Sequence, residues 1–264
     1  MVVESVATMG RVLVTRPAGN ASDMLCSAVK AAGYDVFSQP LLVLNRLPRL
    51  PIAQCQMVLQ LDRYQHIIFI SSNAVHFGMG FIAEHWPQLP AGLNWYAIGS
   101  STAARLEYFG IEAVTPGSEM TSEGLLGVLS LQNVQGQRVL IVKGEGGRDR
   151  LAQELKRRGA LVEELPCYCR GLPAIAPGEL AANVVGWAIE VIMITSGEGL
   201  SNLQVLLTPT ETTKLKGICL IVPSQRVARM AQGAGFEQIV TADNASDLAM
   251  LRALKEWRHS TGER

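Results

Sequence analysis

The sequence predicts an α/β protein made of two similar lobes, each with a five-stranded parallel sheet. Three observations support this prediction. Short apolar segments rich in Val, Ile and Leu alternate with amphipathic segments, which is typical of βαβ units. Many of these segments are apolar throughout, as expected for strands that helices cover on both faces. Finally, the two halves of the chain share an internal repeat.

The composition is that of a well-packed globular protein. The chain has 264 residues, of which 48% are hydrophobic and 17% charged, so it can fill one large core or two smaller ones. Lys and Arg together number 23, as do Asp and Glu, whereas nucleic-acid binders usually carry a basic excess. We therefore expect no nucleic-acid partner.

The sequence also predicts a cytoplasmic protein without a membrane segment. No apolar run approaches the roughly 18–20 residues that span a bilayer. Residues 1–10 include Glu4 and lack the pattern of a signal peptide. The five cysteines fit reduced thiols, and the pair Cys167 and Cys169 is too small a ligand set for zinc. We expect no metal.

The elements follow in a regular order along the chain. The predicted strands cover residues 11–15, 34–37, 66–70, 95–98, 112–115, 138–142, 161–165, 191–195, 218–222 and 238–241. Helical patterns between them cover residues 23–32, 101–109, 122–130, 149–158, 225–232 and 245–257.

The repeat relates a strand, loop and helix near the N-terminus to a second copy in mid-chain. Six residues between Asp23 and Pro40 match six between Asp149 and Pro166, each pair 126 positions apart. Just upstream, the Val-Leu pair at 12–13 matches the pair at 139–140. Such identities at one offset favour a duplicated lobe.

Two chain topologies are compatible with this repeat. In one, residues 44–166 form a continuous lobe inserted into a discontinuous lobe made of residues 1–39 and 172–264. The chain then crosses between lobes at about residues 40–43 and 167–171, and these crossings can pair as a two-stranded linker. In the other, two sequential domains meet near residue 130.

Candidate ligand-binding residues follow the predicted strands. Ligands of doubly wound sheets bind at the carboxyl ends of the strands, where helix N-termini offer backbone N–H groups to anions. Small hydroxyl residues there are more often helix caps than ligand contacts, but here both lobes present the same groups. The candidates are Arg16, Ser71, Ser72, Asn73, Ser100, Ser101, Thr102, Lys143, Arg148, Thr195, Ser196, Gly197, Ser224 and Gln225.

These groups favour an extended polyanion as the ligand. Arg16 and Lys143 occupy matching positions in the repeat, so each lobe contributes a cation. The segment from Lys143 to Arg148 is rich in glycine but matches neither the phosphate loop nor the dinucleotide fingerprint, which argues against a nucleotide. No Gly-x-Ser-x-Gly motif is present, so a serine nucleophile is not expected either.

Tyr168 lies on the second predicted crossing. A phenol there can face the ligand and donate a proton, although position alone favours a packing role.

In order and spacing, these segments resemble the uroporphyrinogen-III synthase family. The resemblance covers residues 11–258 and depends on Val14-Thr-Arg-Pro17, Phe69-Ile-Ser-Ser-Asn-Ala-Val75, Ile98-Gly-Ser-Ser-Thr-Ala103, Lys143-Gly-Glu-Gly-Gly-Arg148, Cys167-Tyr168, Ile194-Thr-Ser-Gly197 and Val222-Pro-Ser-Gln-Arg-Val-Ala228. It implies the inserted topology, with two flavodoxin-like lobes joined by a two-stranded linker.

The resemblance also implies an activity. The family converts the linear tetrapyrrole hydroxymethylbilane to uroporphyrinogen III without a cofactor, losing water and inverting ring D. Its proposed catalytic tyrosine corresponds to Tyr168. We expect a monomeric cytoplasmic lyase of haem biosynthesis. The alternatives are a two-lobe binding protein for a small anionic ligand and a nucleotide-dependent enzyme.

Overall fold

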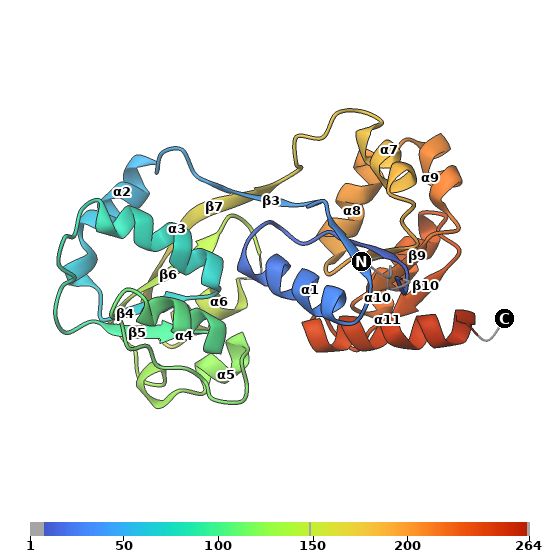
Figure 1. The fold of residues 1–264 in the computed structure, drawn as a ribbon. Helices are drawn as coiled ribbons and strands as arrows, with labels where there is room; N and C mark the ends of the chain where they lie inside the picture. The colour runs from blue at the N-terminus through green and yellow to red at the C-terminus, as the bar shows by residue number, and fades with distance from the viewer. Residues whose placement is uncertain (1–7, 148, 263–264) are drawn as a thin grey trace, which may run out of the picture. The chain divides into compact units, whose positions relative to one another are not determined.

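The computed structural model describes residues 8–147 and 149–262. The chain divides into two compact units (Figure 1). Unit 1 combines Met1–Val43 with Gly171–Arg264, and unit 2 is the continuous segment Leu44–Arg170. Of the described residues, none belongs to a helix long and apolar enough to cross a membrane.

Unit 1 contains a parallel sheet of five strands. The strands are β1 (Arg11–Val14), β2 (Asp35–Ser38), β8 (Val191–Met193), β9 (Cys219–Val222) and β10 (Ile239–Thr241). They lie in the order β10-β9-β8-β1-β2, and every neighbouring pair is parallel. Read in chain order within the unit, this is the 2-1-3-4-5 order of flavodoxin-like folds, as predicted.

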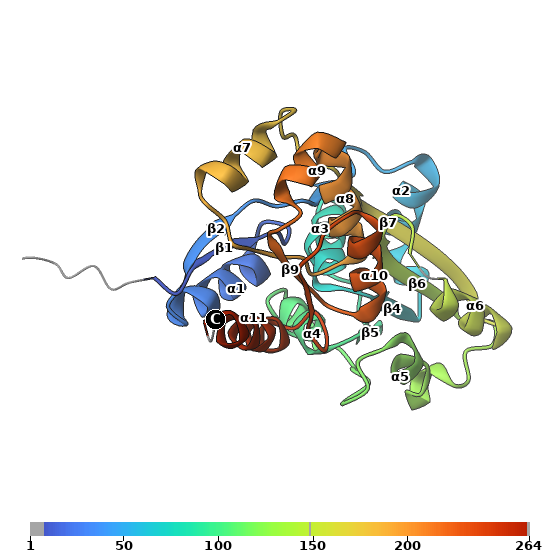
Figure 2. The ribbon, with the colours of Figure 1, turned by 90° about the vertical axis from the view of Figure 1, so that its right-hand side faces the viewer.

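Helices cover both faces of this sheet. Alternate residues of each strand point to opposite faces, so Val12 and Val14 pack with α1 (Asn20–Ala31) and α11 (Asp247–Gly262), which lie side by side in Figure 2. Leu13 faces the other core, which is formed with α7 (Glu179–Gly186), α8 (Gly197–Leu206), α9 (Pro209–Leu215) and α10 (Gln225–Gly233). The strands are apolar on both faces because both faces are buried.

Unit 2 also contains a five-stranded sheet, in which the edge strand β3 has no counterpart in unit 1. Its sheet has the order β3-β7-β6-β4-β5, with β3 (Val43–Arg46), β4 (His66–Phe69), β5 (Asn94–Ala97), β6 (Arg138–Gly144) and β7 (Leu161–Gly171). The β6–β7, β4–β6 and β4–β5 pairs are parallel. Strand β3, which includes one of the chain crossings, lies beside β7 at the edge (Figure 1).

The strands of unit 2 are also buried on both faces. Ile67 and Phe69 pack in a core with α2 (Ile52–Leu59), α3 (Ser72–Ala83) and α4 (Ser100–Glu107). Ile68 faces the opposite core, formed with α5 (Ser122–Leu126) and α6 (Arg150–Arg157). Single 3-10 turns occur at Leu61–Arg63 and Leu129–Leu131.

One predicted strand, residues 112–115, is wrong. The segment forms only an isolated bridge between Val114 and Tyr96 of β5, with two backbone hydrogen bonds. Val114 is 45% exposed, and Pro116 and Gly117, which follow, do not continue the pairing. The bridge nevertheless lies beside β5 as β10 lies beside β9 in unit 1. Matched through the repeat, β7-β6-β4-β5 of unit 2 correspond to β2-β1-β8-β9 of unit 1.

Candidate active site

Tyr168 lies where β7 passes the carboxyl end of β6. Its Cα is in register with Gly144, just after an irregularity in the ladder between Lys143 and Gly144. A Cβ atom at Gly144 would lie only 2.6 Å from Tyr168 Cζ, so the ring lies directly against the glycine backbone. The ring is also stacked on Phe77 of α3, with centroids 5.2 Å apart. As a result Tyr168 is only 2% exposed.

Ser71 is brought to the same place by the next strand. It follows β4, the neighbour of β6, and is the N-cap residue of α3. Its Oγ accepts a hydrogen bond from the Ala74 N–H at 3.0 Å, and lies 3.4 Å from Tyr168 Oη. Ser71 and Tyr168, both predicted site residues, thus meet where the strand order of unit 2 reverses, the usual ligand-binding point of such sheets.

Lys143 does not present a free cation. The residue is 6% exposed, and its Nζ donates to Glu164 Oε1 at 2.7 Å and to Asp149 Oδ1 at 3.2 Å. Burial alone would lower the pKa of Lys143, but hydrogen bonds and charge from the two carboxylates outweigh it and raise the pKa. Lys143 is therefore a charged, internally paired side chain. Arg148 lies outside the described residues.

Arg16, the matching cation of unit 1, is also paired. Its guanidinium forms an ion pair with Asp247 at the start of α11 and donates to the carbonyl oxygens of Ala245 and Ala21. These contacts tie the loop after β1 to the loop before α11. In unit 2, Lys143 likewise pairs within its own unit, with Asp149 just before α6 and with Glu164 of β7.

The hydroxyl residues of unit 1 cap two adjacent helices. Ser196 Oγ accepts the Gly199 N–H at 2.9 Å at the start of α8. Ser224 Oγ accepts the Val227 N–H at 3.5 Å at the start of α10. The neighbours Thr195, Gly197 and Gln225 stand at the same carboxyl edge, since β8 and β9 are adjacent.

The remaining candidates occupy first turns in unit 2. Ser72 and Asn73 open α3, and Ser100, Ser101 and Thr102 open α4. The N-cap of α4 is Gly99, so its hydroxyl residues lie inside the helix rather than at the cap. Thr102 is buried, whereas Asn73, Ser100 and Ser101 are exposed.

Two neighbours of the site were not among the candidates. Phe77 is stacked on the Tyr168 ring. Its position in α3, shortly after the candidates Ser71 to Asn73, is the only feature of the sequence that points to it. Arg226 lies over Gly197, where a Cβ atom would be 3.0 Å from both Nη atoms. Arg226 directly follows Gln225, but its approach to another helix depends on the packing of α8 and α10.

The comparisons with known proteins identify the family. A family model described as "Uroporphyrinogen-III synthase HemD" matches residues 23–252. The chain belongs to the uroporphyrinogen-III synthase family. The uroporphyrinogen-III synthase of Escherichia coli (strain K12) is 32% identical over 249 residues, covering 92% of this chain and 99% of the relative. The Salmonella typhimurium (strain LT2) enzyme is 33% identical over 247 residues, with the same coverage.

Solved uroporphyrinogen-III synthases share the fold. The crystal structure from Helicobacter pylori 26695 matches with a TM-score of 0.61 and 15% identity, covering 94% of this chain and 99% of that one. A mutant enzyme from Thermus thermophilus gives a TM-score of 0.54, also at 15% identity, with 95% and 100% coverage. The predicted family, fold class and enzyme activity are confirmed, and the binding-protein and nucleotide alternatives are not supported.

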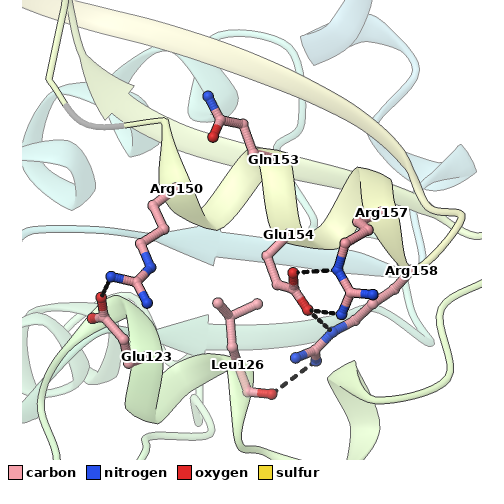
Figure 3. Close-up of a pocket in the computed structure, with 7 residues that line it drawn as sticks. All are labelled: Glu123, Leu126, Arg150, Gln153, Glu154, Arg157 and Arg158. Carbon is pink, nitrogen blue, oxygen red and sulfur yellow. Dashed lines mark hydrogen bonds and ion pairs between the residues drawn. The ribbon is translucent and has the colours of Figure 1, made fainter.

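A pocket of about 450 Å³ lies elsewhere, between α5 and α6 of unit 2 (Figure 3). It contains three arginines, but each is paired: Arg150 with Glu123 at 2.8 Å, and Arg157 and Arg158 with Glu154 at 2.7 and 3.0 Å. None of the predicted site residues lines it. These arginines bind protein carboxylates, so we assign the pocket no role in binding the tetrapyrrole of a uroporphyrinogen-III synthase.

The described residues also contain no cluster of three or more His, Cys, Asp or Glu side chains that would hold a metal ion.

Proposed function

We propose that the chain converts hydroxymethylbilane to uroporphyrinogen III, with loss of one water and inversion of ring D. The assignment of the catalytic residue depends on one observation. Tyr168 Oη and Ser71 Oγ lie 3.4 Å apart at the point where the strand order of unit 2 reverses. It supports Tyr168 as the general acid of a uroporphyrinogen-III synthase.

In this mechanism Tyr168 gives its proton to the leaving hydroxyl group. A phenol O–H that lies within hydrogen-bonding reach of a leaving group can donate its proton to it. The carbon–oxygen bond of the terminal hydroxymethyl group breaks, and the oxygen leaves as water. Closure of the ring later removes one hydrogen from the carbon that forms the new bond, and that proton restores the phenol.

Access to Tyr168 is part of the proposal. Because the residue is 2% exposed, its hydroxyl meets a substrate only when a covering group moves. Phe77, which is partly exposed, is the aromatic side chain stacked on the ring. We assign it the role of the group that turns aside.

Substrate binding in the proposal depends on positioning rather than on strong acids and bases. A substrate with eight carboxylates needs hydrogen-bond donors, and the helix N-termini of both units supply backbone N–H groups and hydroxyls. The proposed contacts are Arg16, Ser72, Asn73, Ser100, Ser101, Thr102, Lys143, Arg148, Thr195, Ser196, Gly197, Ser224 and Gln225. Arg16 and Lys143 would act mainly by holding the loops, since each already binds a carboxylate.

The proposal includes a monomeric cytoplasmic enzyme that uses no cofactor and no nucleic-acid partner. We also infer that units 1 and 2 correspond to the lobes predicted from the sequence, residues 1–39 with 172–264 and residues 44–166, with crossings at about residues 40–43 and 167–171 as the linker.

The first test is incubation with hydroxymethylbilane, followed by oxidation and separation of the isomer I and III porphyrins. We expect isomer III with the wild-type chain. For Tyr168→Phe we expect a loss of about 10- to 10⁴-fold in kcat, with general-acid effects of about 10²- to 10⁴-fold as the upper guide. Formation of isomer I alone by the wild type would contradict the function. An unchanged rate of isomer III formation by Tyr168→Phe would contradict only the role of the tyrosine.

A further inference from the structure

The side chain of Ser71 has one hydrogen-bonding atom, Oγ, and two groups lie within reach of it. Its Oγ accepts the Ala74 N–H, which satisfies one of the first backbone donors of α3. That bond uses an oxygen lone pair and leaves the hydroxyl hydrogen free. The other contact of Ser71 Oγ among the described residues is Tyr168 Oη at 3.4 Å.

We propose that Ser71 is a positioning residue that donates its hydroxyl hydrogen to Tyr168 Oη, rather than a residue that binds the substrate. The inference rests on the acid role proposed for Tyr168. When the phenol gives up its proton, negative charge develops on Oη, and only a donor can then stay bonded to it. Ser71 can supply that donor by rotating its O–H bond toward Oη.

The surroundings keep the two oxygens in line. Backbone pairing of β7 with β6 fixes the Tyr168 Cα, and the Glu145 N–H donates to the Tyr168 carbonyl at 2.8 Å. The backbone of Gly144 lies directly against the ring on one side. Oη can therefore approach Ser71 with little freedom to turn elsewhere. The 3.4 Å separation is longer than a usual O–H···O bond, and hydrogen bonds to a charged oxygen are shorter, so we expect the contact to tighten as charge develops.

The N–H groups at the start of α3 support the same role. The Ala74 N–H polarises the Ser71 hydroxyl, which makes its hydrogen a better donor. The equivalent caps of unit 1 differ, since Ser196 and Ser224 each bond only a backbone N–H in the part of the chain that the structure describes. Among these three capping serines, only Ser71 of unit 2 also contacts a tyrosine hydroxyl.

The test uses Ser71→Ala, Ser71→Thr, Tyr168→Phe and the double variant Ser71→Ala/Tyr168→Phe, with Thr121→Ala as the matched control. Thr121 caps α5 in the same unit and accepts the Gly124 N–H at 3.1 Å, so its replacement removes an equivalent cap away from Tyr168. Both cap losses are expected to lower the melting temperature similarly. kcat and KM for isomer III formation are measured for every variant.

We expect Ser71→Ala to lower kcat about 10- to 100-fold with KM nearly unchanged, as for loss of a hydrogen bond to a charged oxygen. Ser71→Thr keeps both the cap and the donor, and should restore most of kcat. Thr121→Ala should keep the wild-type kcat. In the double variant, loss of Ser71 should have no further effect, because its partner oxygen is already gone.

Several outcomes would overturn the inference. Multiplying effects in the double variant would show that Ser71 acts independently of the phenol. A loss confined to KM would return Ser71 to substrate binding, and an equal loss of kcat in Ser71→Thr would remove the hydroxyl from the explanation. Wild-type kcat in Ser71→Ala beside a slow Tyr168→Phe would overturn this inference alone. Wild-type kcat in Tyr168→Phe would remove the acid role together with the inference.

Discussion

Gly144 determines how closely Tyr168 can approach β6, because glycine has no side chain. In Gly144→Ala the new methyl carbon would lie 2.6 Å from Tyr168 Cζ and 3.0 Å from Oη, so the ring must move. A misplacement of about 1 Å at a reacting group can cost about 100-fold in rate, and we expect a fall of that order in kcat.

The control for this prediction is Gly80→Ala, which adds the same methyl group in open space within unit 2. It should keep the wild-type kcat. Wild-type kcat in Gly144→Ala, with a normal cooperative unfolding transition, would show that the ring position does not matter.

At the residue scale, the sequence could suggest which side chains matter but not their surroundings. Tyr168 could be singled out by its place in the chain and by the family resemblance. Its burial depends on Gly144 and Phe77, which come from β6 and α3 and show no local sign of meeting the ring. The pairing of Arg16 with Asp247 was hidden for the same reason, since these residues are far apart in the chain.

At the scale of the element, helix α3 carries two glycines with opposite surroundings. Gly78 faces the sheet, where a Cβ atom would lie 2.5 Å from Val142 Cγ1 of β6, whereas Gly80 faces open space. Gly78 therefore permits the close contact between α3 and the sheet that places Ser71 beside Tyr168.

These two positions make a matched pair for a stability measurement. We expect Gly78→Ala to lower the free energy of unfolding by about 1–3 kcal/mol, because it overpacks a filled core. Gly80→Ala should raise it by about 0.5–1 kcal/mol, because alanine restricts the unfolded chain and favours the helix. Urea denaturation of both variants checks the prediction, and equal effects would contradict it.

Strands and helices were predictable where the apolar pattern itself decides the structure. Strand β4, apolar at Ile67, Ile68 and Phe69, is an example. The pattern failed for residues 112–115, where sheet pairing stops at a single bridge. Strand β3 covers one of the two extended crossings that the sequence suggests can pair, and it does lie beside β7, although Asn45 and Arg46 give it no apolar strand pattern of its own.

At the scale of the whole molecule, each unit contains one deeply buried thiol. Desolvation raises the pKa of Cys167 in unit 2 and of Cys219 in unit 1 from 9.0 to about 12. Between about pH 9 and pH 12, the thiols of the unfolded chain lose their protons while those of the folded chain keep them. These two thiols therefore leave the free energy of unfolding unchanged below about pH 9 and lower it as the pH rises above that value.

The expected loss is about 1.4 kcal/mol per pH unit for each thiol, from the linkage between proton binding and folding. Cys219→Ala removes one of the two groups, so its free energy of unfolding should fall less steeply with pH than that of the wild type. Urea denaturation at pH 8, 9, 10 and 11 measures both slopes. Parallel slopes would show that Cys219 ionises equally in the folded and unfolded chains.

The insertion of unit 2 between Val43 and Gly171 has a consequence for folding cooperativity. Strands β1 and β8 pair within unit 1, although unit 2 separates them along the chain. When unit 2 is folded, it links the two strands over a short distance and keeps them at a high effective concentration. When unit 2 is unfolded, the same residues form a long flexible loop that must close before the strands can pair. That closure costs entropy on the order of a few kcal/mol. The folding of the inserted unit thus lowers the entropic barrier to assembly of its host.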